Sequence, residues 1–528
     1  MKSARHASEV EVDAVFVTDC SEYQEWMTQV FLAQWRAAGQ HIPRVGAMRL
    51  TRVLACDDED PRLTRVLDLA KAFEEDVEVY RLPELNGKGT DRYLCNNRPR
   101  GLRRWLRERP PRSENHWIFL LDPDMLVLRP LSVTGALRVN GGAAGAGPLK
   151  WHLKDVPAGV ALAHHFTFVP QVWKQLNLSL SVLCSGPGAA LQACEARLRD
   201  FWEDPGLIAA EYSVGVPHLI RAVDLARMSD VWETFTNQVR AQYKGWTAEM
   251  FSWILAAHYS GVRFAYLAEV VSDPNAKELA WEYLDSSSQD ACQRSSLVGD
   301  SKAPAAATAA QPMQPMYSSE GPWLLHYCEV YNISFGRPGG GHDTLFLDKR
   351  AVNRSLRAAS KALRPSSGQT LAVPNFSSLL DCEAPLFEVP PADVLSLGPV
   401  ARSARSGAAP LWLFRRSAWL LCTTLQALNA GLRLFKQKHC PNGAQGESAE
   451  TLRAAPKAAQ IAETLANGLL KGALGRSRSA SSSSSSMDWA ERLNVTRNRI
   501  QRQGRNRREP TATPGKNSGV AESGQSLK

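Results

Sequence analysis

A long apolar run interrupted by two aspartates limits what this chain can fold into more than any other feature. Residues 118–121 lead into Asp122 and Asp124, and residues 125–128 continue the run. Such a stretch predicts a strand that is buried on both faces, as in a parallel sheet. Two carboxylates at its end are costly to bury unpaired. A divalent cation bridging a diphosphate would stabilise them, because these oxygens suit Mg²⁺ or Mn²⁺. The alternative is an ordinary strand end, where one aspartate caps the next turn.

The patterns before this run alternate between strand and helix. Three β-rich runs and two helical stretches precede it: strands at 14–18, 48–55 and 77–82, and helices at 23–38 and 101–107. This order predicts an α/β sandwich with a mostly parallel central sheet. Ligands of such sheets bind beyond the carboxyl ends of the strands. Asp19, which follows the first strand, is therefore expected on the same rim as Asp122.

The positive charge of the chain is concentrated near its end. The formal net charge is +9, and residues 441–528 carry 14 Lys and Arg against 7 Asp and Glu, which leaves about +2 for the rest. This segment is rich in Ser, Ala and Gly, and such a composition cannot offset the entropy of ordering. We therefore expect a disordered tail. The hypothesis of a nucleic-acid partner would have only the basic stretch 497–508 to support it, so we do not expect such a partner.

Composition shifts divide the rest of the chain. We expect a polar N-terminal tail at 1–12, a catalytic domain at 13–440, and low-complexity insertions within it at about 285–322 and 355–374. The 44% hydrophobic content and 15 Trp are ample for the core of such a domain.

The cysteines and glycosylation sequons favour a lumenal compartment. The ten cysteines include no Cys-x-x-Cys pair, which argues against a structural zinc site. Their even number suits disulfides in a secretory compartment, although their spacing does not define the pairs. Five Asn-x-Ser/Thr sequons point the same way. Residues 1–12 show no apolar core of a signal peptide or anchor, so either a leader is missing or another segment targets the chain.

One apolar segment, residues 411–435, could be mistaken for a membrane anchor. Its uncharged part, 417–432, is shorter than the roughly 20 residues that a bilayer requires. Its apolar residues recur at three- and four-residue spacing, which predicts an amphipathic helix packed on the catalytic domain. No clear transmembrane helix is expected, and membrane association stays open.

Three further residues are candidates for the site. Glu249 lies among the aromatic residues of 245–253, as in a sugar site, or simply in the first turn of a helix. His326 lies in a buried-looking strand and is either structural or a third ligand beside the two aspartates. Arg98, expected just before a helix, either meets a phosphate or is solvated.

The order of these motifs resembles that of the plant and algal hydroxyproline O-arabinosyltransferases and peptidyl serine galactosyltransferases. The similar segments run from about 13 to 440: 15–26, 51–56, 97–99 with 105–106, 121–125, 215–224, 248–250, 326–331 and 382–386. Arg98 replaces the lysine of the family's Asn-Lys-Pro segment. Segments 215–250 and 326–331 resemble the arabinosyltransferase branch in particular.

The resemblance implies a GT-A-like α/β fold and a UDP-sugar donor. Asp122, Asp124 and His326 would bind Mn²⁺ or Mg²⁺, with Asp124 catalytic through the metal. Thr18 and Asp19 would lie near uracil and ribose, and Arg98 near the diphosphate. Glu249 would face the sugar or the acceptor hydroxyl as a second catalytic residue.

The resemblance further implies transfer of L-arabinofuranose to hydroxyproline in hydroxyproline-rich, cell-wall-type proteins such as extensins, in the Golgi or ER lumen. Galactosyl transfer to serine or hydroxyproline and a glycan-binding pseudoenzyme of the same fold are the alternatives. The choice of sugar rests on a few side chains of the sugar pocket.

Overall fold

The structure is a computed structural model, in which several segments of the chain are described. They are residues 10–38, 41–42, 46–84, 93–138, 149–166, 169–176, 178–185, 189–276, 278–286, 321–336, 342–350, 352, 378–382, 384, 386–387, 389–390, 394–397, 399 and 410–440. The chain divides into two compact units, and every described element lies in the first of them, which comprises residues 1–400 and 409–469. The tail after residue 440 and nearly all of both predicted insertions lie outside the described residues.

A nine-stranded sheet forms the centre of this unit, in the order β5-β4-β1-β6-β11-β10-β12-β8-β9. Its strands are β1 (Glu11–Asp19), β4 (Arg49–Ala55), β5 (Val77–Leu82), β6 (His116–Leu121), β8 (Thr134–Arg138), β9 (Leu149–His152), β10 (Val160–His165), β11 (Val214–Arg221) and β12 (Arg263–Leu267). Strands β5, β4, β1 and β6 are parallel, and β11 joins β6 antiparallel. The predicted α/β class is confirmed, with parallel strands from β5 to β6 and a sheet that becomes mixed beyond β6.

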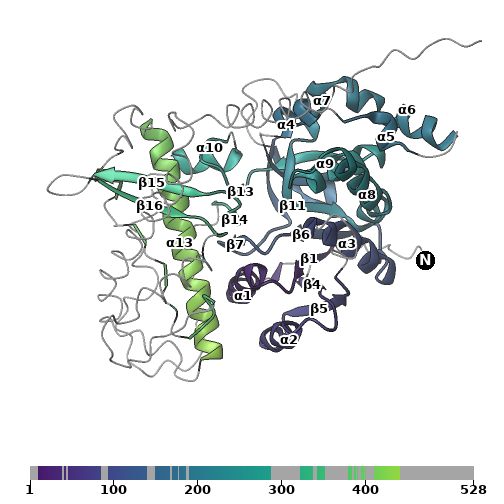
Figure 1. Ribbon diagram of the computed structural model, residues 1–528. Coiled ribbons are helices and arrows are strands. Elements are labelled where there is room, and N and C mark those ends of the chain that lie inside the picture. The colour runs from purple at the N-terminus through teal and green to yellow at the C-terminus, as the bar shows by residue number, and fades with distance from the viewer. Residues whose placement is uncertain are drawn as a thin grey trace, which may run out of the picture. The chain divides into compact units, whose positions relative to one another are not determined.

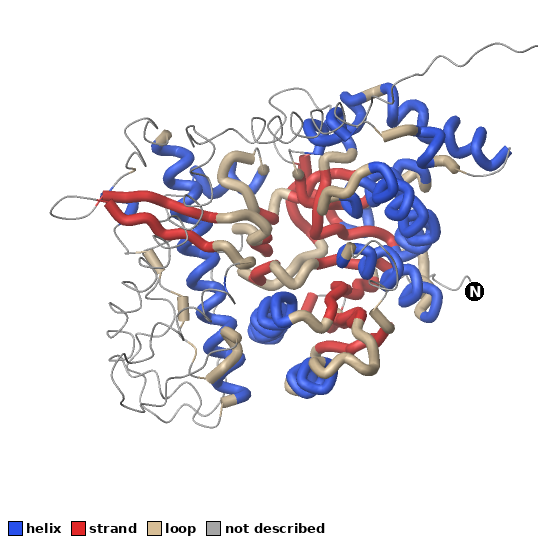
Figure 2. Tube along the Cα trace, in the orientation of Figure 1, coloured by secondary structure: helices blue, strands red, loops and turns tan. Residues whose placement is uncertain are grey.

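Helices cover both faces of the parallel strands (Figures 1 and 2). Alternate residues of a strand point to opposite faces, and here Phe16 packs on Phe31 of α1 (Glu22–Ala37), whereas Val17 lies near Gly101 of α3 (Asn97–Glu108). The other helices are α2 (Leu63–Lys71), α4 (Val169–Leu176), α5 (Leu180–Leu183), α6 (Ala189–Glu203), α7 (Pro205–Glu211), α8 (Ala222–Gln242), α9 (Ala248–Tyr259), α10 (Leu279–Ser286), α12 (Val394–Leu397) and α13 (Leu411–His439).

The apolar run around the two aspartates is two strands rather than the single strand we expected. Strand β6 ends at Leu121, and β7 (Met125–Val127) belongs to a separate sheet in the order β13-β14-β7. Its partners are β13 (Val270–Val271) and β14 (Leu324–His326). Pro123 lies in the turn between β6 and β7, and proline has no N–H to offer a sheet ladder. The chain therefore changes sheets at the two aspartates.

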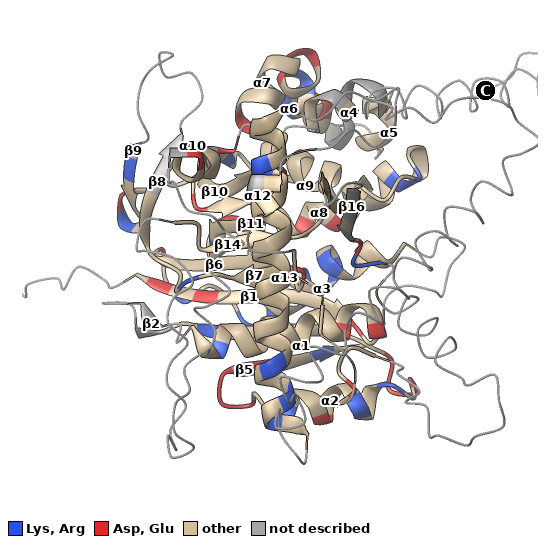
Figure 3. Ribbon diagram, turned by 90° about the vertical axis from the view of Figure 1, so that its left-hand side faces the viewer, with Lys and Arg blue, Asp and Glu red and all other residues tan. Residues whose placement is uncertain are grey.

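Helix α13 is the predicted amphipathic helix, and it packs on the body as expected. It contacts α1, β7 and β15 (Tyr331–Gly336) and has a largely buried middle. Figure 3 shows its charged residues toward its two ends. No helix among the described residues combines the length and apolar character needed to cross a membrane.

Three disulfides join described cysteines: Cys20–Cys56, Cys184–Cys194 and Cys382–Cys440. Cys422 is disulfide-bonded as well. The first disulfide joins the residues that directly follow β1 and β4, next to the rim where β6 also ends. The remaining strands are β16 (His342–Leu347), which pairs with β15, and the short pair β2 (His41–Ile42) and β3 (Gly46–Ala47).

Candidate active site

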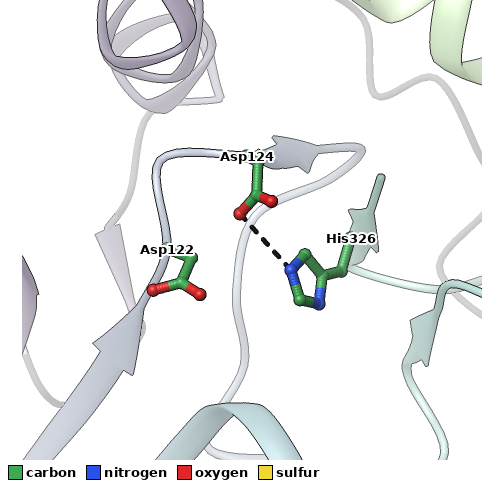
Figure 4. A group of neighbouring side chains, drawn as sticks. All are labelled: Asp122, Asp124 and His326. Atoms are coloured by element: carbon green, nitrogen blue, oxygen red, sulfur yellow. Dashed lines mark ion pairs between the residues drawn. The ribbon is translucent and has the colours of Figure 1, made fainter. Parts of the chain in front are cut away.

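The ladder between β7 and β14 determines where His326 lies. In this antiparallel pair His326 is opposite Met125, and the Tyr327 N–H donates to the carbonyl of Asp124 over 3.2 Å. Asp122 and Asp124 lie in the turn between β6 and β7, and His326 ends β14. Residues some 200 positions apart in the sequence are thereby fixed side by side (Figure 4).

The three side chains form a cluster that is suited to a divalent cation. One potential ligand atom from each lies within 4.8 Å of the others, and His326 Nε2 is 3.3 Å from Asp124 Oδ1. Asp124 and His326 are buried, and Asp122 is half-buried. Two carboxylates and one imidazole are ligands that Mn²⁺ accepts, and Mg²⁺ also prefers carboxylate oxygens. The residues present therefore fit the predicted metal, although the ion itself is not identified by them.

Arg98 brings the turn of Asp122 together with helix α9. Its guanidinium is ion-paired with Asp122, and its Nη1 is 3.5 Å from Glu249 Oε1. We expected Arg98 to precede a helix, but α3 already begins at Asn97. Pro99 does not prevent this, because proline is tolerated in the first turn of a helix. Arg98 is thus held by two carboxylates and is not simply solvated.

Glu249 lies in the first turn of α9, as one of the two expectations has it, and its role in a sugar site stays a prediction. Its backbone N–H donates to the hydroxyl of Tyr93 over 2.8 Å, and its side chain faces Arg98. Burial raises the pKa of the Glu249 carboxyl, while the positive charge of Arg98 opposes the shift. The carboxylate is therefore positioned and buried at the site rather than exposed at a helix end.

Lys349 is a member of the site that the sequence analysis missed. It follows β16, is 7% exposed, and its ammonium group is ion-paired with Asp124. Burial alone would raise the pKa of Asp124, but Lys349 and His326 together hold it below its ordinary value. In the sequence Asp348-Lys349-Arg350 resembles any charged turn, so no local signal identifies Lys349.

Asp19 and Thr18 lie at the rim of β1, but their observed contacts are structural. The Asp19 carboxylate accepts from the N–H of Ser21 over 2.7 Å. The Thr18 hydroxyl accepts from Arg52 Nε over 2.8 Å, and Arg52 is ion-paired with Glu25 of α1. The structure thus places both residues at the expected end of the sheet, and their predicted contacts with uracil and ribose stay predictions.

An exposed tryptophan lies beside this group. Trp246 is 61% exposed, and its carbonyl accepts from the Tyr93 hydroxyl over 2.5 Å. The guanidinium of Arg240 makes a cation–π contact with Tyr93, and its Cζ lies 4.1 Å from the ring centroid. Since the same hydroxyl accepts from the N–H of Glu249, Tyr93 ties the backbone at Trp246 to the start of α9.

Comparison with known sequences finds similarity to two curated proteins, and no family model matches the chain. A peptidyl serine alpha-galactosyltransferase of Arabidopsis thaliana is 28% identical over 120 residues, which are 23% of this chain and 14% of that protein. A peptidyl serine alpha-galactosyltransferase of Chlamydomonas reinhardtii is 27% identical over 142 residues, 26% of this chain and 17% of that protein. The chain thus spans less than a fifth of the length of these relatives in the matched segments.

Comparison with solved structures finds glycosyltransferases of low similarity. The apo structure of the bifunctional glycosyltransferase WbbM is 12% identical, with a TM-score of 0.29, over 61% of this chain and 46% of that one. The galactosyltransferase LgtC, in complex with donor and acceptor sugar analogs, is 13% identical, with a TM-score of 0.29, over 60% of this chain and 87% of that one.

Proposed function

We propose that this chain is a metal-dependent glycosyltransferase that transfers a sugar from a UDP-sugar to a hydroxylated side chain of a protein. The observation that carries the proposal is the cluster of Asp122, Asp124 and His326 at the carboxyl end of β6, with Arg98 and Lys349 against it. The partial similarity to two peptidyl glycosyltransferases supports the reaction class.

Each residue of the site has a chemical task in this proposal. A cation held by Asp122, Asp124 and His326 would supply positive charge to the diphosphate leaving group. Arg98 and Lys349 place two more positive charges beside the same carboxylates. The Glu249 carboxylate, whose Oε1 is 3.5 Å from Arg98 Nη1, would stabilise positive character on the sugar. Asp19 and Thr18 are proposed to bind the nucleoside.

The donor and acceptor are proposed from the sequence motifs. The arabinosyltransferase-like segments 215–250 and 326–331 favour L-arabinofuranose and hydroxyproline-rich, cell-wall-type acceptors. The second candidate is galactosyl transfer to peptidyl serine, and it is favoured by the similarity to two peptidyl serine alpha-galactosyltransferases. We further propose a Golgi or ER lumenal location, which the three disulfides support because such bonds persist in oxidising compartments.

Trp246 is proposed to contact the acceptor. An aromatic ring next to a sugar-transfer site can pack on proline-type rings of an extended peptide. Trp246→Ala should therefore raise the KM for a hydroxyproline-rich peptide by about tenfold, which is the loss of roughly 1.4 kcal/mol of binding, with little change in kcat. Trp412→Ala is the matched control, because Trp412 is similarly exposed but lies on α13. An unchanged KM in Trp246→Ala would exclude this role.

The proposed function is tested by measuring UDP release from the full chain. UDP-arabinofuranose and UDP-galactose are compared with hydroxyproline and serine peptides, in the presence of Mn²⁺ or of a chelator. We expect metal-dependent release with one donor, and its loss in Asp122→Asn but not in the exposed control Asp230→Asn. UDP binding without release would favour the glycan-binding pseudoenzyme. A folded protein that binds no UDP would contradict the proposal.

A further inference from the structure

Both aspartates of the candidate metal site already face a cation of the protein. Arg98 from α3 is ion-paired with Asp122, and Lys349 after β16 is ion-paired with Asp124. These four side chains are between 8% and 20% exposed, so water screens the pairs only in part. The two cations come from segments that are about 250 residues apart and converge on one turn.

A metal ion at this site would compete with these cations for the negative charge of the two carboxylates. If a divalent ion takes the carboxylates of Asp122 and Asp124, Arg98 and Lys349 lose their anionic partners and face a like charge. The two cations are not equivalent in this respect. Arg98 keeps Glu249, whose Oε1 is 3.5 Å from Nη1. Lys349 keeps the ring of Tyr327, whose centroid is 5.6 Å from the ammonium group.

A diphosphate would restore the balance of charge. It brings two or more negative charges to the place where the metal and the two released cations meet, and both guanidinium and ammonium groups bind phosphate oxygens well. Metal and nucleoside diphosphate should therefore bind this site together much better than either binds alone.

We infer that Arg98 and Lys349 are counter-ions of the metal ligands, and that they couple the binding of the divalent cation to the binding of a nucleoside diphosphate. The inference rests on the proposed function, because it assumes a metal at Asp122, Asp124 and His326. It assigns Lys349 the larger share of the coupling, since among the described residues Lys349 is ion-paired with Asp124 alone, whereas Arg98 also pairs with Glu249.

Calorimetric titration of the full chain with Mn²⁺, with and without UDP, tests this inference. In the wild-type protein UDP should tighten Mn²⁺ binding by a factor of about 5–150, and Mn²⁺ should tighten UDP binding equally. Lys349→Met should bind Mn²⁺ alone about tenfold more tightly, because a competing cation is gone, and the effect of UDP should shrink. The direction of the change in Mn²⁺ affinity is decisive. Removing a residue that only supports the fold or only binds phosphate would not raise the affinity for the metal alone.

Matched variants separate this effect from a general change of charge or fold. Lys71→Met and Arg104→Met remove one positive charge at exposed positions, Arg104 from the same helix as Arg98, and should leave Mn²⁺ binding unchanged. Lys349→Arg should keep the coupling. If Lys349→Met does not fold, as judged by circular dichroism, Arg98→Met serves for the same comparison and should show a smaller gain.

The possible results distinguish this inference from the proposed function. Weaker or unchanged binding of Mn²⁺ alone to the folded Lys349→Met and Arg98→Met variants, with the coupling intact, overturns the counter-ion role while the transferase proposal stands. A wild-type protein that binds neither Mn²⁺ nor UDP overturns both.

Discussion

At the scale of single residues, the state of the Glu249 carboxyl is the feature most open to experiment. Burial raises its pKa above the ordinary value, and Arg98 opposes the shift. A raised carboxyl pKa means that folding favours the protonated form, so this contribution to stability is present below the unfolded-state pKa. It is lost as the pH rises through the folded-state pKa. The proposed role requires the ionised form, so activity and this part of stability change in opposite directions.

Glu249→Gln should lower kcat/KM by about 10²–10³-fold, because it removes the charge that the proposed function assigns to the reacting centre. In the wild type, kcat/KM should rise with pH through the raised pKa, and this acid limb should be absent from the residual activity of the variant. Rates of UDP release across the pH range measure both. The exposed Glu203→Gln serves as control, and an identical pH profile in Glu249→Gln would exclude the role.

Arg52 is a second residue with a definite expected cost. It is fully buried in β4, and its Nη2 lies 2.6 Å from Glu25 of α1. Removing one partner of a buried ion pair leaves an uncompensated charge, which costs about 3–5 kcal/mol. Arg52→Met should therefore lower the free energy of unfolding by this amount in urea denaturation.

Two comparisons support the assignment of that cost to the unpaired charge. Arg49→Met, in the same strand but 63% exposed and paired with Asp13, should change stability by less than about 1 kcal/mol. The double variant Arg52→Met/Glu25→Leu should be more stable than Arg52→Met, because no charge is then buried alone. If the double variant is less stable, the attribution is wrong.

At the scale of elements, Gln34 of α1 connects three of them behind the site. Its side chain donates to the Ala427 carbonyl of α13 over 2.6 Å and accepts from the Val127 N–H of β7 over 3.0 Å. Strand β7 directly follows Asp124, so this bridge supports the turn that carries the candidate ligands. Helix α13 also packs closely on α1 at Gly431, where a Cβ would lie only 2.7 Å from Val30 Cγ1.

Gln34→Met should cost about 1–3 kcal/mol of stability, because it leaves the buried N–H of Val127 without its acceptor and removes the hydrogen bond to the Ala427 carbonyl. It should also weaken Mn²⁺ binding in the presence of UDP, since the turn of Asp124 loses its support. Chemical denaturation and calorimetry measure the two effects. The exposed variant Gln192→Met should stay within about 0.5 kcal/mol of the wild type. Unchanged stability in Gln34→Met would contradict the bridge.

At the scale of the whole described unit, α13 is the last element, yet it packs against the first helix. Its end is fixed covalently, because Cys440 directly follows the helix and is bonded to Cys382. The two cysteines are 58 residues apart in the sequence, whereas Cys184 and Cys194 are 10 apart. In the chain-entropy account a longer closed loop gives the larger stabilisation.

The double variant Cys382→Ser/Cys440→Ser should therefore lose about 4 kcal/mol of stability, against about 3 kcal/mol for Cys184→Ser/Cys194→Ser. Since Cys382–Cys440 holds the end of α13 and not the ligand turn, Mn²⁺ binding at 25 °C should be kept in the folded protein. Thermal unfolding under oxidising conditions gives the order of the two losses. The opposite order would show that local packing outweighs loop entropy here.

Local periodicity predicted the elements well where each element is regular. Strand Val77–Leu82 lies where it was expected, and the β1, α1 and β4 predictions differ from the structure by a few residues at their ends. The same logic failed at residues 116–128, where composition gave one strand and the chain forms two in different sheets. Apolar residues indicate burial, but they do not indicate which sheet buries them.

The sequence by itself determined the α/β class, the two aspartates at the end of a strand, and the candidates Arg98, Glu249 and His326. Only the tertiary structure decided that these side chains meet, and that Lys349 joins them. The reason is physical. A strand or helix is specified by the spacing of its own residues, whereas the partners of Asp124 depend on the β7–β14 register and on a turn more than 200 residues away. No local pattern records such a pairing, because it arises from the packing of the whole chain.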